Sequence, residues 1–226
     1  MDDYVDVITI VEGKTEQIFI ESILAPYLIE KKVIIKATQV SKPGQKGGDV
    51  KFSRAVKDIG NHLKQRSETY VSTFVDYYGI KEWPGLDKVP LQATPTEIAE
   101  AVNAETRKTV AQSYPQLRTD TRFIPYLAVH EFEALLFSCS ETLATRLGIK
   151  AAHVEKVLSD CGEPEAINNN PTTAPSKRLD AWSEGGKFAK TSSGISIATD
   201  IGIPTIREKC PVFNAWLLCL ESLTGK

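Results

Sequence analysis

The stretch Val5–Glu16, with the sequence VDVITIVEGKTE, predicts the fold class of this chain. Its first seven residues are mostly β-branched and apolar, which is typical of a buried strand. Gly13 then allows a sharp backbone turn, and the apolar spacing that follows is that of a helix reaching about residue 30. Glu12 lies between the two, at the end of the strand. In a parallel α/β sheet this is where ligands and reacting groups collect. The stretch therefore predicts a βα unit that carries a candidate site.

Two further segments repeat this pattern of an apolar strand that ends in an acid. They are Thr73–Gly79 (TFVDYYG) and Tyr126–Glu133 (YLAVHEFE). Strand patterns alternate with helical patterns, which predicts an α/β fold with a mostly parallel sheet of about four strands and helices on both faces. We expect strands at residues 5–11, 33–40, 70–75 and 122–129. We place this core at residues 1–138 and expect residues 139–226 to form a helical extension packed on it, as a single structural unit.

The composition is that of an ordinary globular protein. Of 226 residues, 42% are hydrophobic and 25% are charged, so a disordered chain is excluded. No stretch approaches the roughly 18 consecutive apolar residues of a membrane helix. The acidic N-terminus lacks the basic region of a signal peptide, and the four cysteines form no CxxC pair. We therefore expect a cytoplasmic protein with free thiols and no membrane partner.

The charge is unevenly distributed, although the net charge is only −2. Residues 31–66 contain ten Lys or Arg and two acids, whereas residues 67–105 contain seven acids and two Lys. A basic region beside an acidic cleft suits a cation-assisted enzyme that acts on a polyanion. Charged helix faces exposed to solvent are the alternative explanation.

Several common sites are disfavoured. Gly13-Lys14-Thr15 resembles the end of a phosphate-binding loop, but Ile8 occupies the place of the required upstream glycine. No GxGxxG follows a strand, so a dinucleotide site is disfavoured. His130 begins HEFEA rather than HExxH, and the three histidines lie in different elements, which argues against zinc.

The remaining candidate is a site made of oxygen ligands: Glu12, Asp76, Glu131 and Glu133. Carboxylates and water are the ligands that magnesium and manganese prefer, and neighbouring carboxylates repel one another unless a cation lies between them. The alternative is that each acid caps a helix N-terminus, which is our preferred explanation for Glu16. Since Glu131 and Glu133 point to different sides of a helix, we expect only one of them to reach the site.

The residues also resemble a known family. Val11–Glu16 (VEGKTE) resembles the first motif of Toprim domains, which topoisomerases, DnaG-type primases and overcoming-lysogenization-defect nucleases share, and Asp76 resembles their aspartate motif. FVDYYG, HEFEALLFS, TAPSKRL and IREKCPVFNAWL together resemble the bacterial domain of unknown function 4276 family over nearly the whole chain. The resemblance implies a Toprim-like fold and an association with an ABC-type ATPase in phage defence.

One departure from the Toprim pattern concerns the aspartate motif. It is Asp-x-Asp in Toprim domains, but here Tyr78 stands at the second position. A tyrosine with a pKa of about 10 cannot replace a carboxylate as a magnesium ligand. Either Glu131 or Glu133 supplies the charge, or the metal binds weakly, or catalysis has been lost. Tyr78 itself is a candidate to stack on a base or ribose, with core packing as the alternative.

Basic side chains complete the expected site. Lys177 and Arg178 follow a loop and are candidates to hold substrate phosphates, as are Lys42 and Lys46 in the glycine-rich loop. We expect a magnesium- or manganese-dependent nuclease acting on DNA or RNA, with Lys177 and the acids as its catalytic residues. The alternative is a non-catalytic interaction subunit that docks on an ATPase partner. A phosphotransfer enzyme is a weaker third possibility, and homodimerisation is a further expectation.

Overall fold

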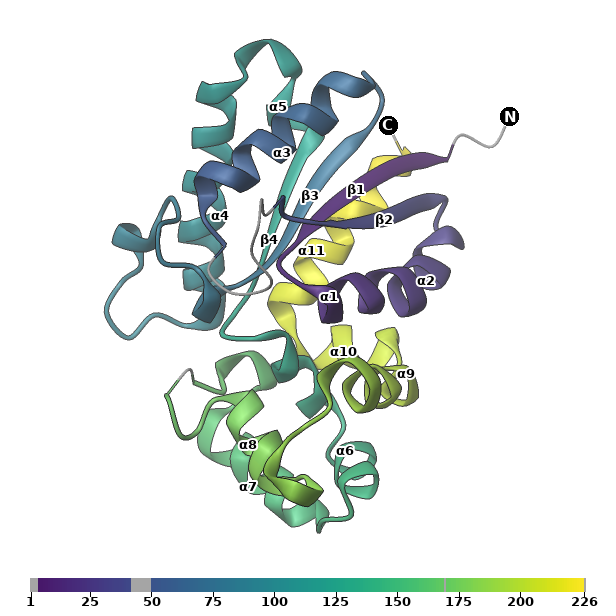
Figure 1. Cartoon of the computed structure of the whole chain (residues 1–226), viewed down its shortest axis with the longest axis vertical. Coiled ribbons are helices and arrows are strands. Elements are labelled where there is room, and N and C mark those ends of the chain that lie inside the picture. Colours follow the sequence, from purple (N-terminus) through teal and green to yellow (C-terminus); the bar gives the residue numbers. More distant parts are fainter. Residues whose placement is uncertain (1–3, 42–49, 169, 226) are drawn as a thin grey trace.

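In the computed structural model, which describes residues 4–41, 50–168 and 170–225, the described chain forms one four-stranded sheet (Figure 1). Its strands are β1 (Val5–Val11), β2 (Val33–Gln39), β3 (Tyr70–Asp76) and β4 (Phe123–Ala128). They follow the order β2-β1-β3-β4, and every neighbouring pair is parallel. The predicted α/β class is confirmed, and each strand lies within about one residue of its expected range.

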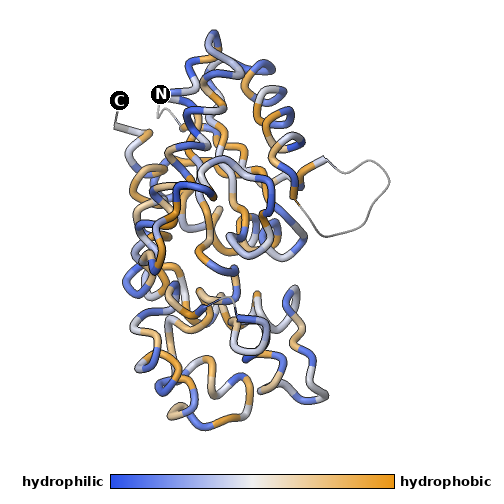
Figure 2. The backbone as a smooth tube through the Cα atoms, turned by 90° about the vertical axis from the view of Figure 1, so that its left-hand side faces the viewer, coloured by the Kyte–Doolittle hydropathy of each residue, from blue (hydrophilic) through white to orange (hydrophobic). Residues whose placement is uncertain are grey.

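Helices cover both faces of the sheet, as the sequence predicts (Figure 1). One face carries α1 (Lys14–Phe19), α2 (Ala25–Ile29) and α11 (Pro211–Glu221). The other carries α3 (Phe52–Gln65) and α4 (Pro95–Ser113), with the short α5 (Thr119–Arg122) leading into β4. Figure 2 shows hydrophobic and hydrophilic residues alternating around the helices, as expected of helices that cover a core on one side only.

The order of the strands creates a switch point between β1 and β3. The chain leaves β1 through α1 and α2 on one face to reach β2, and it leaves β3 through α4 on the other face to reach β4. Val11 pairs with Phe74, so these two neighbouring strands end at nearly the same height. The connections diverge beyond this point, and such a crevice is the usual ligand position of an open α/β sheet.

The expected single helix at about residues 15–30 is interrupted. A π-helical turn at Ile20–Leu24 separates α1 from α2, and the N–H of Ala25 bonds to the carbonyl of Ile20, five residues back. Pro26 follows directly and has no N–H to donate to the preceding turn. The α4 helix begins as predicted. Thr94 accepts a hydrogen bond from the N–H of Glu97, whose carboxylate accepts one from the N–H of Thr94.

No strand follows Ala128 within the described part of the chain, which agrees with the expected helical C-terminal region. The segment Phe132–Ser138 is a 3₁₀ run rather than the start of an α-helix. It is followed by α6 (Ser140–Leu147), α7 (Ala151–Cys161), α8 (Pro175–Trp182), α9 (Ile195–Ile201) and α10 (Ile203–Lys209). In Figure 1, α6, α7 and α8 lie in a lower lobe, and α11 returns to the sheet.

The last helix, α11, is built into the core of the sheet. Trp216 stacks on Tyr126 of β4, with ring centroids 4.6 Å apart, and packs edge-on against Phe74 of β3. Its indole N–H donates to the hydroxyl of Ser72, which donates in turn to the carbonyl of Ile124. These contacts satisfy buried polar groups inside an aromatic core, so α11 is an integral layer of the fold.

Candidate functional site

The strand ends bring the predicted acids to one edge of the sheet. Glu12 directly follows β1, and Asp76 is the last residue of β3. Glu131 and Glu133 lie just beyond the end of β4, which pairs with β3 up to Asp76 and Ala128. The acids are therefore gathered at the switch point between β1 and β3 and along the adjoining end of β4.

Asp76 lies at the centre of these acids. Its Oδ1 accepts a hydrogen bond of 3.1 Å from the N–H of Phe132. Burial raises its pKa well above the usual value, and so do the negative charges of Glu16, Glu133, Glu12 and Glu131, in that order. The five residues Glu12, Glu16, Asp76, Glu131 and Glu133 are hereafter the acidic cluster. Such like-charge crowding is unfavourable without a compensating cation.

Two members of the cluster come from the β1–α1 junction. Glu16 accepts a hydrogen bond of 2.9 Å from the N–H of Gly13, so its predicted helix-capping role is confirmed. Burial raises the pKa of Glu16, and the charge of Glu12 adds to this effect. The carboxylate of Glu12 lies tightly against Gly79. A Cβ atom added at Gly79 would lie only 2.6 Å from Glu12 Oε2. The glycine thus leaves the space that the Glu12 carboxylate fills.

Glu131 is bound to the start of α8. Its two carboxylate oxygens accept hydrogen bonds of 2.9 Å from the backbone N–H and from the hydroxyl of Ser176. The side chain is 7% exposed. This is a helix-capping arrangement in which a carboxylate from another segment compensates the N-terminal N–H groups. The predicted role of Glu131 as a metal ligand would require it to share or release this partner.

Glu133 forms an ion pair with Lys190, a residue that no sequence motif identifies. Lys190 Nζ lies 2.6 Å from Glu133 Oε1, and the Glu133 side chain is 2% exposed. Burial lowers the pKa of the Lys190 ammonium. The negative charges of Glu133, Glu131 and Asp76 have a larger effect in the opposite direction, so the pKa lies above its usual value. Burial also raises the pKa of Glu133, against the attraction of Lys190. The only sequence signal for Lys190 is a lysine within a stretch rich in glycine and serine.

The backbone at the end of β4 adopts an unusual conformation. His130 has φ of 67°, a left-handed value that is uncommon for a residue other than glycine. Its carbonyl accepts the N–H of Tyr78, at 3.0 Å, and so links the β3 and β4 ends. Burial lowers the pKa of His130, which favours a neutral imidazole. Strained backbone of this kind is frequent at functional sites.

Further residues are predicted to contact the substrate: Tyr78 and four basic side chains. Tyr78 is 50% exposed, so core packing, the alternative explanation for it, is wrong. Lys177 lies 3.8 Å from Asp180, and Arg178 donates to the carbonyl of Thr173. In the described structure, neither of these basic residues forms a hydrogen bond or ion pair with the acidic cluster. Lys42 and Lys46 lie outside the described residues.

The cluster matches a hard divalent cation in chemistry but is not preassembled around one. Among the described residues, no three acidic, histidine or cysteine side chains are grouped so that they could hold a metal ion. The carboxylates are instead engaged elsewhere: Glu16 with Gly13, Glu131 with Ser176, and Glu133 with Lys190. All five donate oxygen, as magnesium and manganese prefer. The donor set fits the predicted metal, and binding would require some of these partners to be exchanged.

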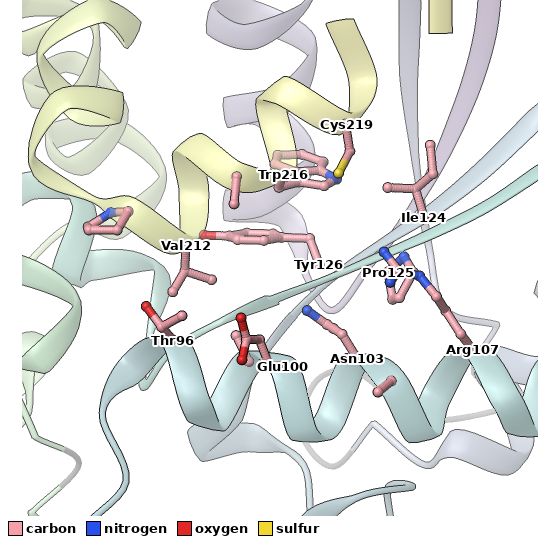
Figure 3. Close-up of a pocket in the computed structure, with 14 residues that line it drawn as sticks. Thr96, Glu100, Asn103, Arg107, Ile124, Pro125, Tyr126, Val212, Trp216 and Cys219 are labelled. Atoms are coloured by element: carbon pink, nitrogen blue, oxygen red, sulfur yellow. The ribbon is translucent and has the colours of Figure 1, made fainter. Parts of the chain in front are cut away.

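A pocket lined largely by apolar side chains lies elsewhere on the molecule (Figure 3). This cavity of about 330 Å³ lies between α4 and α11 beside β4. Glu100, Asn103 and Arg107 of α4 face Val212 and Trp216 of α11 across it (Figure 3). No member of the acidic cluster lines the cavity. The acids that the sequence predicts as site residues therefore lie at the strand ends and not in this pocket.

The fold and the site define an α/β protein with an acidic cluster at the switch point of a parallel sheet. The chain belongs to the family described as a domain of unknown function, DUF4276, whose model matches residues 11–221. This confirms the family to which the sequence motifs point. Comparisons with curated proteins and with solved structures give no significant match. Throughout residues 4–41, 50–168 and 170–225, every helix is too short or too polar to span a membrane.

Proposed function

We propose that this protein is a magnesium- or manganese-dependent nuclease that hydrolyses phosphodiesters in DNA or RNA. The observation that carries the proposal is the acidic cluster at the switch point, centred on Asp76. Crowding five acids at one buried edge opposes stability, because each negative charge penalises its neighbours, even where single acids have partners of their own. A function that recruits a cation compensates this cost.

The residues have distinct roles in the proposal. Glu12, Asp76 and Glu133 would hold the cation, while Glu131 positions α8 and Glu16 caps α1. A bound Mg²⁺ or Mn²⁺ would stabilise negative charge on the phosphodiester and favour ionisation of a bound water. Tyr78, which is half exposed beside Asp76, is available to stack on a base or ribose. The partly exposed ammonium of Lys190 is near enough to the cluster to contact a phosphate oxygen.

A second candidate function is a non-catalytic subunit that docks on an ATPase partner. It is favoured because Glu16, Glu131 and Glu133 already have partners other than a metal. In addition, no three described acidic, histidine or cysteine side chains are grouped to hold one ion. The presence of Tyr78 in place of a second aspartate also favours it. The ABC-type ATPase and a role in phage defence are parts of the proposal that rest on the resemblance, and a cytoplasmic location rests on the composition. Homodimerisation is a further part of the proposal, which no single residue carries.

The test is a cleavage assay with the full chain. Plasmid, single-stranded DNA and tRNA are incubated with the protein in Mg²⁺, in Mn²⁺ or in EDTA, with and without a candidate ABC-type ATPase. We expect metal-dependent cleavage that Glu12→Gln and Asp76→Asn each reduce at least about 100-fold. Glu141→Gln serves as the matched control, because Glu141 is an exposed acid outside the cluster.

The outcomes separate the two functions. Cleavage that survives both substitutions contradicts the assignment of the acids. Absence of cleavage under every condition, combined with stable binding to the ATPase, supports the interaction subunit.

A further inference from the structure

We propose that Lys190 is the resident counter-cation of the acidic cluster: its ammonium occupies the position beside Glu133 that the divalent cation takes, and it then transfers to a substrate phosphate. This inference rests on the proposed metal site. The inference goes beyond that site because it assigns the exchange of an ammonium for a divalent cation to Lys190, a residue that no sequence motif identifies.

The charge of Lys190 reaches several members of the acidic cluster. Lys190 Nζ lies 2.6 Å from Glu133 Oε1, and its charge also acts on Glu16, Asp76 and Glu131. The lysine thus interacts with acids that follow β1, β3 and β4 alike. A cation shared among acids from three strand ends is the electrostatic role that a divalent metal would have.

The backbone around Lys190 is held in place, whereas the lysine side chain is long and partly exposed. Phe188 is 5% exposed, and its N–H donates to Asp180 Oδ1. Gly194 packs against the Phe188 ring and donates its N–H to the carbonyl of Ala189. The turn at 190–194 packs against α1 and the 132–138 segment. Lys190 therefore starts from an anchored position, at the end of a flexible four-carbon stem.

The two partners of the ion pair differ in their exposure to solvent. The Glu133 side chain is 2% exposed, whereas that of Lys190 is 46% exposed. The carboxylate is fixed in the interior, and the ammonium reaches it from the solvent side. An ammonium has three donors and is easily hydrated, so Lys190 can leave Glu133 at low cost once another cation compensates that carboxylate. A phosphate that enters from the solvent side then meets the released ammonium.

The test measures metal binding without any substrate. Mn²⁺ is titrated calorimetrically into the wild-type chain, Lys190→Met and the control Lys187→Met, which replaces an exposed lysine three residues away. Methionine keeps an unbranched stem and removes the charge. We expect Lys190→Met to bind Mn²⁺ at least about fivefold more tightly, since the competing cation is gone. Lys187→Met should bind it as the wild type does.

A second measurement follows the lysine itself. Acetylation of amines by an N-hydroxysuccinimide ester, read by mass spectrometry, should modify Lys190 faster when Mn²⁺ is present. Lys187 in the same sample should show no change. In the cleavage assay with saturating Mn²⁺, Lys190→Met should lower the turnover rate, because the phosphate contact is lost, and Lys190→Arg should restore part of it.

The outcomes distinguish this inference from the proposed function. If the wild type binds Mn²⁺ and Lys190→Met binds it equally or more weakly, the counter-cation role is wrong and the metal site stands. If neither protein binds Mn²⁺, the metal site itself is wrong, and the exchange fails with it. Tighter binding by Lys190→Met together with metal-dependent labelling of Lys190 supports the inference.

Discussion

The carboxylate of Glu131 accepts hydrogen bonds from both the backbone N–H and the hydroxyl of Ser176, at 2.9 Å each. This pairing connects the end of β4 to the first turn of α8, across 45 residues of sequence. An acid that sequence motifs associate with metal binding is thereby given a structural partner. Stability measurements can separate the two roles.

We predict that Glu131→Ala lowers the free energy of unfolding by about 1–3 kcal/mol, because it leaves buried donors of Ser176 without an acceptor. Ser176→Ala should cost about 1 kcal/mol, since only the hydroxyl contact is lost. Urea denaturation of both single variants and of the double variant gives the coupling between the residues. If Glu131→Ala leaves stability unchanged but abolishes Mn²⁺ binding, Glu131 is a metal ligand instead.

A second prediction concerns the glycine that packs against Glu12. In Gly79→Ala the new methyl group would lie 2.6 Å from Glu12 Oε2, so the carboxylate must move. We expect cleavage to fall roughly 100-fold, as is typical when a reacting group is misplaced by about 1 Å. The melting temperature should change little. Gly186→Ala is the control, since its methyl group meets no atom within 4 Å.

Wild-type activity in Gly79→Ala would show that the position of Glu12 is irrelevant to the reaction. Loss of activity in Gly186→Ala as well would show that the assay reports general damage. Gly186 has φ of 69°, so its substitution carries a backbone cost of its own and gives a strict comparison.

A third prediction concerns pH and a buried acid outside the cluster. Glu165 is 1% exposed and accepts hydrogen bonds from the N–H groups of Val212 and Phe213 at the start of α11. Burial raises its pKa to about 7, although these two hydrogen bonds oppose the shift. The folded state therefore holds this proton more tightly than the unfolded state, where the pKa is near 4.5.

The stabilising contribution of the protonated Glu165 is fully present below pH 4.5 and is lost as the pH rises through 7. The full effect is about 3 kcal/mol, because the pKa rises from 4.5 to about 7 and each unit corresponds to roughly 1.36 kcal/mol. Glu165→Gln cannot titrate. The wild type should therefore lose stability between pH 5 and pH 8, whereas the variant should not. The difference in unfolding free energy, variant minus wild type, should rise over this range in urea denaturation. An identical difference at both pH values would contradict the assigned pKa.

The elements that the sequence predicts well are those with local signals. Each strand is a run of β-branched and apolar residues, and Thr94, Pro95 and Glu97 mark the start of α4 through contacts within one turn. The sequence pattern predicts one continuous helix and gives no sign of the π-helical turn that separates α1 from α2, although Pro26 lies just after this turn. Apolar periodicity continues through a π-helical turn almost unchanged, so periodicity alone does not reveal it.

The candidate site was predictable only in part. Glu12 and Asp76 are recognisable because strand ends are local features, and parallel topology then brings them together. The partners of Glu131 and Glu133 cannot be recognised in the sequence, because Ser176 and Lys190 reach them from the helical C-terminal region through tertiary packing. Lys177 and Arg178 lie in a sequence motif of the family, but the lysine that forms an ion pair with the acidic cluster is Lys190, through Glu133. Side-chain contacts across such separations have no sequence periodicity to identify them.

The hydrogen bond from Trp216 to Ser72 has a consequence for synthesis on the ribosome. All four strands are translated well before Trp216, yet one face of their sheet is completed only by the helix that contains it. Until then Phe74 and Tyr126 lack their aromatic neighbour, and the nascent chain presents an apolar surface open to chaperones or to aggregation. A chain that stalls before α11 emerges would therefore be recognised as unfinished, even though every strand of its sheet has already been made.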